Sequence, residues 1–110
     1  MTAFSNETID KVWEKARGAT EPNAEIWRRD ECGAWIKHDQ YGHERSEFGW
    51  KIENVSLGGP DTPANLRALH HANSYDRASG RAKCHVTADQ TATPVMEHIR
   101  EPRNRKARAL

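Results

Sequence analysis

Residues 48–77 read FGWKIENVSLGGPDTPANLRALHHANSYDR, and this stretch decides the expected fold. Residues 48–55 alternate between apolar and polar side chains, which predicts a strand with Phe48, Trp50 and Ile52 on one face. The Gly- and Pro-rich segment 56–65 predicts a loop. Residues 66–78 predict a short extended segment that enters a helix. These elements together indicate an α+β domain.

Toward the N-terminus, residues 25–37 predict short strands, or one strand and a turn, around Cys32-Gly33. Residues 5–17 predict a helix, which Ser5 or Asn6 can cap and Gly18 can end. The helix carries one apolar stripe at i, i+3, i+4 and i+7, formed by Ile9, Val12, Trp13 and Ala16.

Toward the C-terminus, residues 79–94 predict a loop with one strand at 83–87, and residues 95–100 predict a short helix. The last eleven residues, 100–110, hold five Arg or Lys residues against one Glu, which gives a charge of +4 in a chain of net charge +1. We therefore expect a single domain at 1–99, with its core motif at 27–78, followed by a basic C-terminal tail at 100–110.

The chain has two cysteines, Cys32 and Cys84, and no Cys-x-x-Cys pair, which argues against a zinc knuckle. Two free thiols are the simpler interpretation, with one disulfide as the alternative. The sequence contains no apolar run long enough to span a bilayer, and its N-terminus has no signal-peptide core. These features predict a cytoplasmic protein without a membrane partner.

Four tryptophans stand out in a chain with only 35% hydrophobic residues. In a domain this small, large aromatic side chains supply much of the core. We expect most of the tryptophans to be buried, and base stacking is the alternative function for them and for Tyr41.

Residues 27–77 resemble a family of small bacterial and phage HNH endonucleases. Members usually read Arg-Asp-x-x-Gly, then Tyr-Gly, then Gly-Trp-Glu-Ile-Asp-His-Ile, a Gly-Gly-x-Asp loop, Asn-Leu-x-x-Leu and a helix with a further Asn. The matching positions are Arg29-Asp30, Gly33, Ile36, Tyr41-Gly42, Ser46, Gly49-Trp50, Ile52, Gly58-Gly59, Asp61, Asn65-Leu66, Leu69 and Asn73. The resemblance implies an HNH-type ββα-metal fold.

In that family, a strand Asp and a helix Asn or His bind a divalent cation, and the His after the Asp activates water. The resemblance places Glu53 at the ligand Asp, Asn54 at the general-base His, Asn65 at the Asn that braces the loop, and Asn73 at the helix ligand. Glu53 and Asn73 would form a weak or vestigial site for Mg²⁺ or Mn²⁺, and no other cofactor is expected.

Asn54 decides the expected chemistry, because a carboxamide has no titratable lone pair near neutral pH. Loss of a general base costs about 10²–10⁴-fold in rate. His70 could replace the base or bind the metal, and a partly exposed histidine at the start of a helix is the alternative interpretation. We therefore expect that the protein is not an enzyme, although a metal-dependent endonuclease with a non-standard site remains the alternative.

Three functions are consistent with these residues. The first is an inactivated HNH-like protein that binds nucleic acid or a nucleic-acid-processing complex, such as a host defence nuclease, as an anti-CRISPR-type inhibitor of a phage or mobile element would. The second is an active endonuclease, and the third is a DNA-binding accessory factor. Phosphate contacts are expected from the basic tail, through Arg100, Arg103, Arg105, Lys106 and Arg108.

Overall fold

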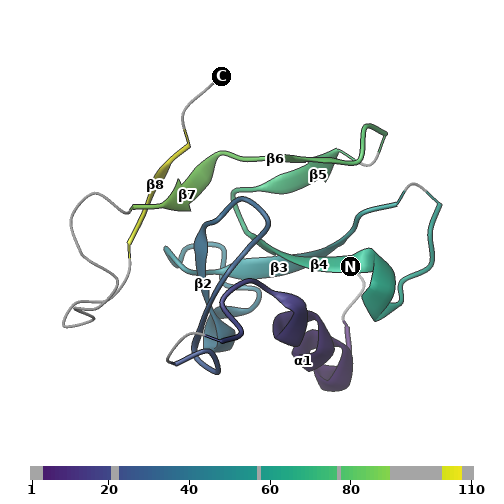
Figure 1. The fold of residues 1–110 in the computed structure, drawn as a ribbon, viewed down its shortest axis with the longest axis horizontal. Coiled ribbons are helices and arrows are strands. Elements are labelled where there is room, and N and C mark those ends of the chain that lie inside the picture. The colour runs from purple at the N-terminus through teal and green to yellow at the C-terminus, as the bar shows by residue number, and fades with distance from the viewer. Residues whose placement is uncertain (1–3, 21–22, 57, 77, 90–102, 108–110) are drawn as a thin grey trace.

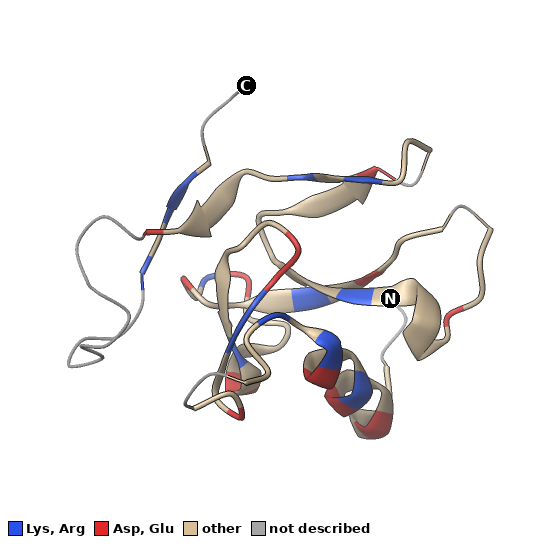
Figure 2. Ribbon diagram, viewed as in Figure 1, with Lys and Arg blue, Asp and Glu red and all other residues tan. Residues whose placement is uncertain are grey.

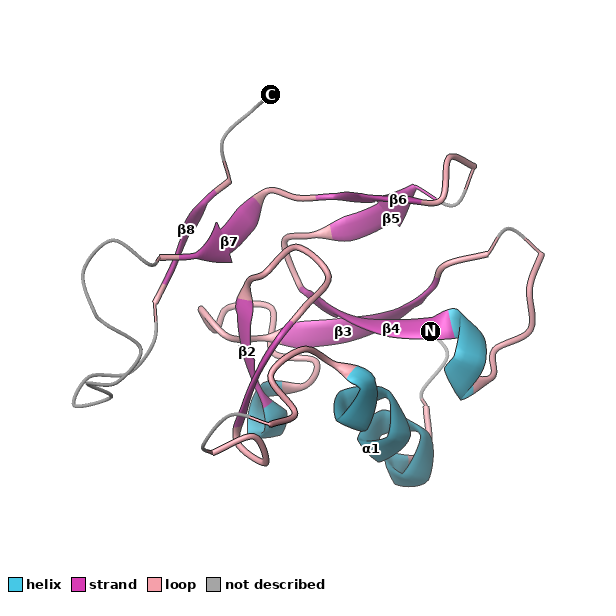
Figure 3. Ribbon diagram, viewed as in Figure 1, coloured by secondary structure: helices cyan, strands magenta, loops and turns pink. Residues whose placement is uncertain are grey.

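The computed structural model describes residues 4–20, 23–56, 58–76, 78–89 and 103–107. It shows an α+β fold with one α-helix, two short 3-10 helices and strands that pair in antiparallel twos among these residues (Figure 1, Figure 3). The central pair is β3 (Trp50–Asn54) and β4 (Leu66–His70). In Figure 1, the helix lies on one side of this pair and the remaining C-terminal strands lie on the other.

The N-terminal helix α1 (Asn6–Lys15) confirms the prediction for residues 5–17. Ser5 is the N-cap, and its hydroxyl accepts a hydrogen bond from the backbone amide of Thr8. Val12 and Trp13 are buried, and the rest of the predicted apolar stripe packs against the same core. The stripe therefore sets which face of α1 meets β4.

The core lies between α1 and the β3–β4 pair. Trp50 and Ile52 are buried on β3, as the alternating pattern predicts, and Leu66 and Ala68 are buried on β4. Phe48, predicted on the same face, lies outside β3 and packs against Trp27, so that part of the prediction is wrong. Full burial of a large apolar side chain stabilises the fold by roughly 1.5–3 kcal/mol. The four residues therefore anchor the hairpin on the helix.

Strands β1 (Trp27–Arg29) and β2 (Trp35–Lys37) pair as a hairpin around Cys32-Gly33, so the first of the two predicted alternatives, short strands, is the one observed. Gly33 has φ +84°, which suits glycine in this turn. On the inward face, the buried guanidinium of Arg28 donates hydrogen bonds to carbonyls near the C-terminal end of α1, those of Trp13, Glu14 and Ala16. A cation suits the C-terminal end of a helix, and here it adds to the hydrogen bond that the Ala16 amide already donates to the Trp13 carbonyl.

The predicted helix after residue 70 is wrong. The extended segment is β4, but the chain then turns and forms β5 (Ser74–Asp76), which pairs with β6 (Arg81–Lys83). Between these strands, Gly80 has φ +70° and donates its amide to the carbonyl of Asp76, while the Asp76 carboxylate accepts from the amide of Ala78. A hairpin turn therefore takes the place of the expected helix.

The predicted strand at 83–87 is divided between β6 and β7 (Val86–Ala88). Strand β7 pairs with β8 (Asn104–Lys106), so this part of the predicted basic tail belongs to the fold. The predicted short helix at 95–100 lies outside the described residues, as does the predicted boundary between domain and tail. Within the ranges described here, no helix has the length and apolar character needed to cross a membrane.

Candidate functional site

Asn54, at the predicted general-base position, ends β3 and holds the loop that follows. Its Nδ2 donates to the carbonyls of Gly59 and Pro60 at 2.9 and 3.1 Å and to Oδ1 of Asp61 at 3.0 Å. Its Oδ1 accepts from the amide of Ser56 at 2.9 Å. Both ends of the carboxamide therefore position the loop.

Asn65 lies across the same loop, and its Nδ2 donates to the carbonyl of Pro60 at 3.2 Å. Asn54 and Asn65 thus share the carbonyl of Pro60 as an acceptor. The resemblance implies that Asn65 alone braces this loop, but here both residues brace it. Gly59 fits tightly there, because a Cβ at this position would lie 2.8 Å from Cβ of Ser56.

Glu53 ties β3 to β5. Its Oε1 accepts from the backbone amide of Tyr75 at 2.8 Å, and its Oε2 forms an ion pair with Nζ of Lys51 at 3.0 Å. The Glu53 side chain is 28% exposed. Each carboxylate oxygen therefore already has a partner in the fold.

His70 is buried at the end of β4, with an exposed fraction of 3%. Its Nδ1 accepts from the amide of Ala72 at 3.1 Å, and its Nε2 lies 2.6 Å from the carbonyl oxygen of Glu47. A ring that accepts at Nδ1 and meets a carbonyl at Nε2 is the neutral tautomer with its proton on Nε2. Burial lowers the pKa of His70, against the opposing effect of the Glu47 carbonyl.

Asn73 and Asp30 meet in the interior of the fold. Asn73 is fully buried, and its Nδ2 donates to Oδ2 of Asp30 at 2.9 Å and to the carbonyl of Val86 at 3.1 Å. Its Oδ1 accepts from the amides of His85 and Val86 at 2.7 and 3.0 Å. All four hydrogen-bonding positions of the Asn73 amide are therefore occupied.

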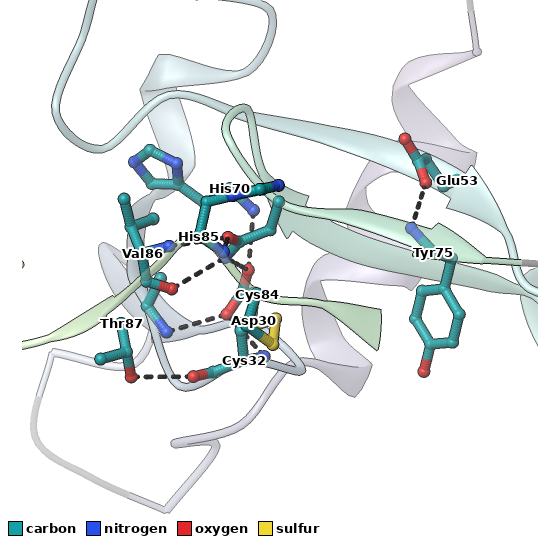
Figure 4. The surroundings of a disulfide bond; sticks show 11 residues. Asp30, Cys32, Glu53, His70, Tyr75, Cys84, His85, Val86 and Thr87 are labelled. Carbon is teal, nitrogen blue, oxygen red and sulfur yellow. Dashed lines mark hydrogen bonds between the residues drawn. A yellow bond between two sulfur atoms is a disulfide. The ribbon is translucent and has the colours of Figure 1, made fainter. Parts of the chain in front are cut away.

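The Asp30 carboxylate accepts from four donors. Oδ1 accepts from the amides of Cys32 and Ala34, and Oδ2 accepts from the amide of His70 and from Asn73 (Figure 4). We call Asp30, His70 and Asn73 the Asp30 cluster. It joins the β1–β2 turn to the end of β4 and to the start of β7.

A disulfide between Cys32 and Cys84 lies beside the Asp30 cluster (Figure 4). The two Cα atoms are 5.5 Å apart, although the cysteines are separated by 52 positions in the sequence. The simpler interpretation of two free thiols is therefore wrong. The hydroxyl of Thr87 adds a second link next to it by donating to the carbonyl of Cys32 at 2.8 Å.

The predicted site residues fall into separate groups. His70 and Asn73 both bind the Asp30 carboxylate. Glu53 lies apart from Asp30 and His70, next to Tyr75, as Figure 4 shows. In the β3–β4 register, Trp50 is opposite His70 and Glu53 is opposite Arg67. The described residues contain no group of three or more His, Cys, Asp or Glu side chains arranged to hold a metal ion.

The predicted phosphate contacts are only partly described. Arg103 pairs with Glu47 through Nε–Oε2 at 2.9 Å, whereas Arg105 and Lys106 on β8 are exposed. Figure 2 shows basic residues along β6 and β8, in contrast to α1, where both signs of charge alternate. Arg100 and Arg108 lie outside the described residues.

Asp30 and Asn104 are the important polar residues to which sequence reasoning gave no role, although Asp30 is among the positions that match the family. Asn104 donates from Nδ2 to the carbonyls of Trp35 and Glu47, and its Oδ1 accepts from the amide of Trp35. A local signal could have indicated the role of Asp30, because an Asp side chain commonly accepts from the backbone amide two residues later in a turn. Nothing local marks Asn104, whose partners are 69 and 57 positions away.

These contacts define an α+β domain whose buried polar side chains hold its strands and loops together. Comparisons with models of protein families, with curated proteins and with solved structures found no significant match.

Proposed function

We propose that the chain is a non-catalytic binding protein with an HNH-like sequence. The observation that carries this proposal is the state of His70, whose two ring nitrogens are both engaged by the backbone. Asn54 has no basic nitrogen, and its carboxamide is used to hold a loop. Neither residue that the resemblance points to is a free proton acceptor.

The HNH-type fold is part of this proposal. The β3–β4 hairpin would correspond to the two strands of a ββα-metal unit, and the turn and β5 would replace its helix. Metal binding by Glu53 and Asn73 would have to displace the amide of Tyr75 and the contacts of Asn73 inside the Asp30 cluster. This requirement supports a vestigial site in preference to a working one.

The proposed partner is nucleic acid or a complex that processes it, such as a host defence nuclease blocked by an anti-CRISPR-type inhibitor. The exposed basic residues Arg105 and Lys106 support an anionic partner, because phosphates are neutralised mainly by Arg and Lys. This partner class rests on the resemblance as well as on charge.

Plasmid nicking tests the absence of catalysis. The full chain should leave supercoiled DNA intact in Mg²⁺, Mn²⁺ and Ni²⁺, while co-purification from the native host should recover nucleic acid or a nucleic-acid-processing complex. Cleavage that disappears in Glu53→Ala would refute the proposal. Glu53→Asp combined with Asn54→His is the matched variant, and gain of nicking would show that the HNH geometry is retained.

A cytoplasmic location remains a prediction. Disulfides are rare in reducing compartments, so the Cys32–Cys84 bond weighs against it. Trapping of thiols by alkylation in intact cells, followed by mass spectrometry, would show whether the bond exists where the protein works.

A further inference from the structure

The outward face of the β1–β2 hairpin carries alternating aromatic and basic side chains. In the antiparallel register, Trp27 lies opposite Lys37 and Arg29 lies opposite Trp35. Residues directly opposite each other in such a pair point to the same side of the sheet. The other face belongs to the buried residues Arg28 and Ile36. Two tryptophans and two cations therefore share the outward face.

Phe48 extends this set, which we call the aromatic face: Trp27, Arg29, Trp35, Lys37 and Phe48. The ring centroids of Trp27 and Phe48 are 4.8 Å apart, and those of Trp27 and Trp35 are 6.4 Å apart, both edge to face. All three rings are half-buried, unlike Trp13 and Trp50, which belong to the core. The aromatic face is thus separate from the core between α1 and the β3–β4 pair.

Positive charge lies directly on these rings. The Arg29 guanidinium carbon lies 5.3 Å from the ring centroid of Trp35, and Nζ of Lys37 lies 5.4 Å from that of Trp27. Cations at such distances are attracted to the face of an indole ring. They are also close enough to meet a phosphate that follows a base stacked on the same rings.

Strand β8 extends the positive charge beside the aromatic face. The Asn104 side chain binds both the amide and the carbonyl of Trp35, so the first residue of β8 contacts β2 at Trp35. The next residues, Arg105 and Lys106, are exposed. Glu47, the nearby carboxylate, is paired with Arg103. The cations Arg29, Lys37, Arg105 and Lys106 therefore supply positive charge on or near this face.

We propose that the aromatic face is a stacking surface for single-stranded nucleic acid. Aromatic rings with interleaved Arg and Lys suit unpaired bases, because every base has a π-face and each is followed by a phosphate. A duplex hides its base faces, so these rings could not stack on the bases of a duplex. This inference deepens the proposed function, on which it rests, by naming the ligand and the surface.

Fluorescence anisotropy with a labelled oligothymidylate of about 20 nucleotides tests the proposal, since small single-strand-binding folds cover ~4–16 nucleotides. An oligouridylate and a duplex of the same length serve as parallel probes, and all titrations contain EDTA. The full chain should bind one or both single strands more tightly than the duplex. Quenching of tryptophan fluorescence should accompany that binding.

Trp35→Ala should weaken single-strand binding by about fivefold or more, and Trp35→Phe should retain most of it, because a smaller ring still stacks. Ile26→Ala is the matched control, since it removes an exposed apolar side chain next to the aromatic face and should leave affinity unchanged. Lys37→Glu should weaken binding and reduce its salt dependence, whereas Lys11→Glu, with the same charge change on α1, should not.

Equal affinity of the wild type and Trp35→Ala for single strands would overturn the proposal, as would duplex binding as tight as single-strand binding. If Trp35→Ala fails to fold, wild-type affinity in Lys37→Glu would overturn it instead. Absence of binding to any probe would overturn the stacking surface and leave the proposed function with a protein complex as partner.

Two further outcomes separate the stacking surface from other roles. Self-association lost in Trp35→Ala, without oligonucleotide binding, would overturn the proposal and assign the face to a second copy of the chain. Metal-dependent cleavage lost in Glu53→Ala would refute the non-catalytic function, while single-strand binding in EDTA would still support the stacking surface.

Discussion

Nδ2 of Asn73 donates a 2.9 Å hydrogen bond to Oδ2 of Asp30, and the two residues are 43 positions apart in the sequence. Asp30 is 1% exposed and Asn73 is fully buried. A buried carboxylate is stable only when its oxygens are well hydrogen bonded, and Asp30 meets this requirement with four donors. The pair therefore joins the β1–β2 turn to the segment that follows β4.

Asp30→Ala should destabilise the fold by at least about 3 kcal/mol, because it leaves buried donors on several elements without an acceptor. Urea unfolding followed by tryptophan fluorescence measures this change. Asp39→Asn is the control, since Asp39 lies on the surface, outside the core, and it should change stability by less than about 0.5 kcal/mol. Similar losses in both variants would contradict a central role for Asp30.

Loss of the disulfide should also weaken the fold. The Cys32–Cys84 bond closes a loop of 52 positions, and the chain-entropy relation for a loop of this length gives about 4 kcal/mol of stabilisation. The Cys32→Ala, Cys84→Ala double variant should therefore unfold at lower urea than the oxidised wild type.

The reduced wild type is the control for the disulfide, since it should match the double variant.

The Asp30 cluster should still hold β7 in the reduced protein, because its hydrogen bonds do not involve sulfur. Amide exchange at Val86 that stayed slow after reduction would support this view, and complete loss of protection there would contradict it.

Because of His70, the free energy of unfolding should decrease as the pH is lowered. In the folded state, burial holds the pKa of its imidazole below the ordinary value of 6.5. The unfolded chain therefore takes up a proton at a higher pH than the folded chain does. The contribution of neutral His70 is fully present above pH 6.5 and is lost as the pH falls below that value. Asp30 and Glu47 oppose the lowering of its pKa, whereas His71 adds to it.

Urea midpoints measured between neutral pH and about pH 5 check this effect, since unfolded histidine titrates near pH 6.5. The wild type should lose more stability over this range than His70→Gln, because the variant has no imidazole to protonate at this position. His43→Gln is the control, since His43 is exposed, and it should keep the dependence of the wild type. Parallel slopes for all three proteins would show that His70 does not set the pH response.

Asn54→Asp should destabilise the protein by about 1–3 kcal/mol, because a carboxylate cannot donate to Gly59 and Pro60 and repels Asp61. Thermal unfolding measures the loss. In contrast, Asp61→Asn keeps an oxygen that can accept from Asn54, so its effect should be much smaller. Equal stability of Asn54→Asp and the wild type would mean that Asn54 does not hold the loop.

The extent to which the site could be predicted differs between residues. The resemblance assigns roles to Asn54 and Asn73, and His70 is the candidate substitute base; each of the three has specific hydrogen-bond partners in the fold. The resemblance did not indicate which groups each of these residues binds. Glu53 and Asn73 are assigned to one metal site by the resemblance, but they bind to different parts of the fold, Tyr75 in one case and Asp30 in the other.

By itself, the sequence determined α1 with its Ser5 cap, the turn at Cys32-Gly33 and the alternation of β3. These features depend on local periodicity and turn chemistry, which a short segment carries on its own. Tertiary structure decided the Cys32–Cys84 bond, the turn after His70 in place of a helix, and the pairing of β8 with β7. The reason is that each depends on a partner many positions away. Asn73, for example, satisfies donors and acceptors on Asp30, His85 and Val86, and no local pattern in residues 71–76 indicates those partners.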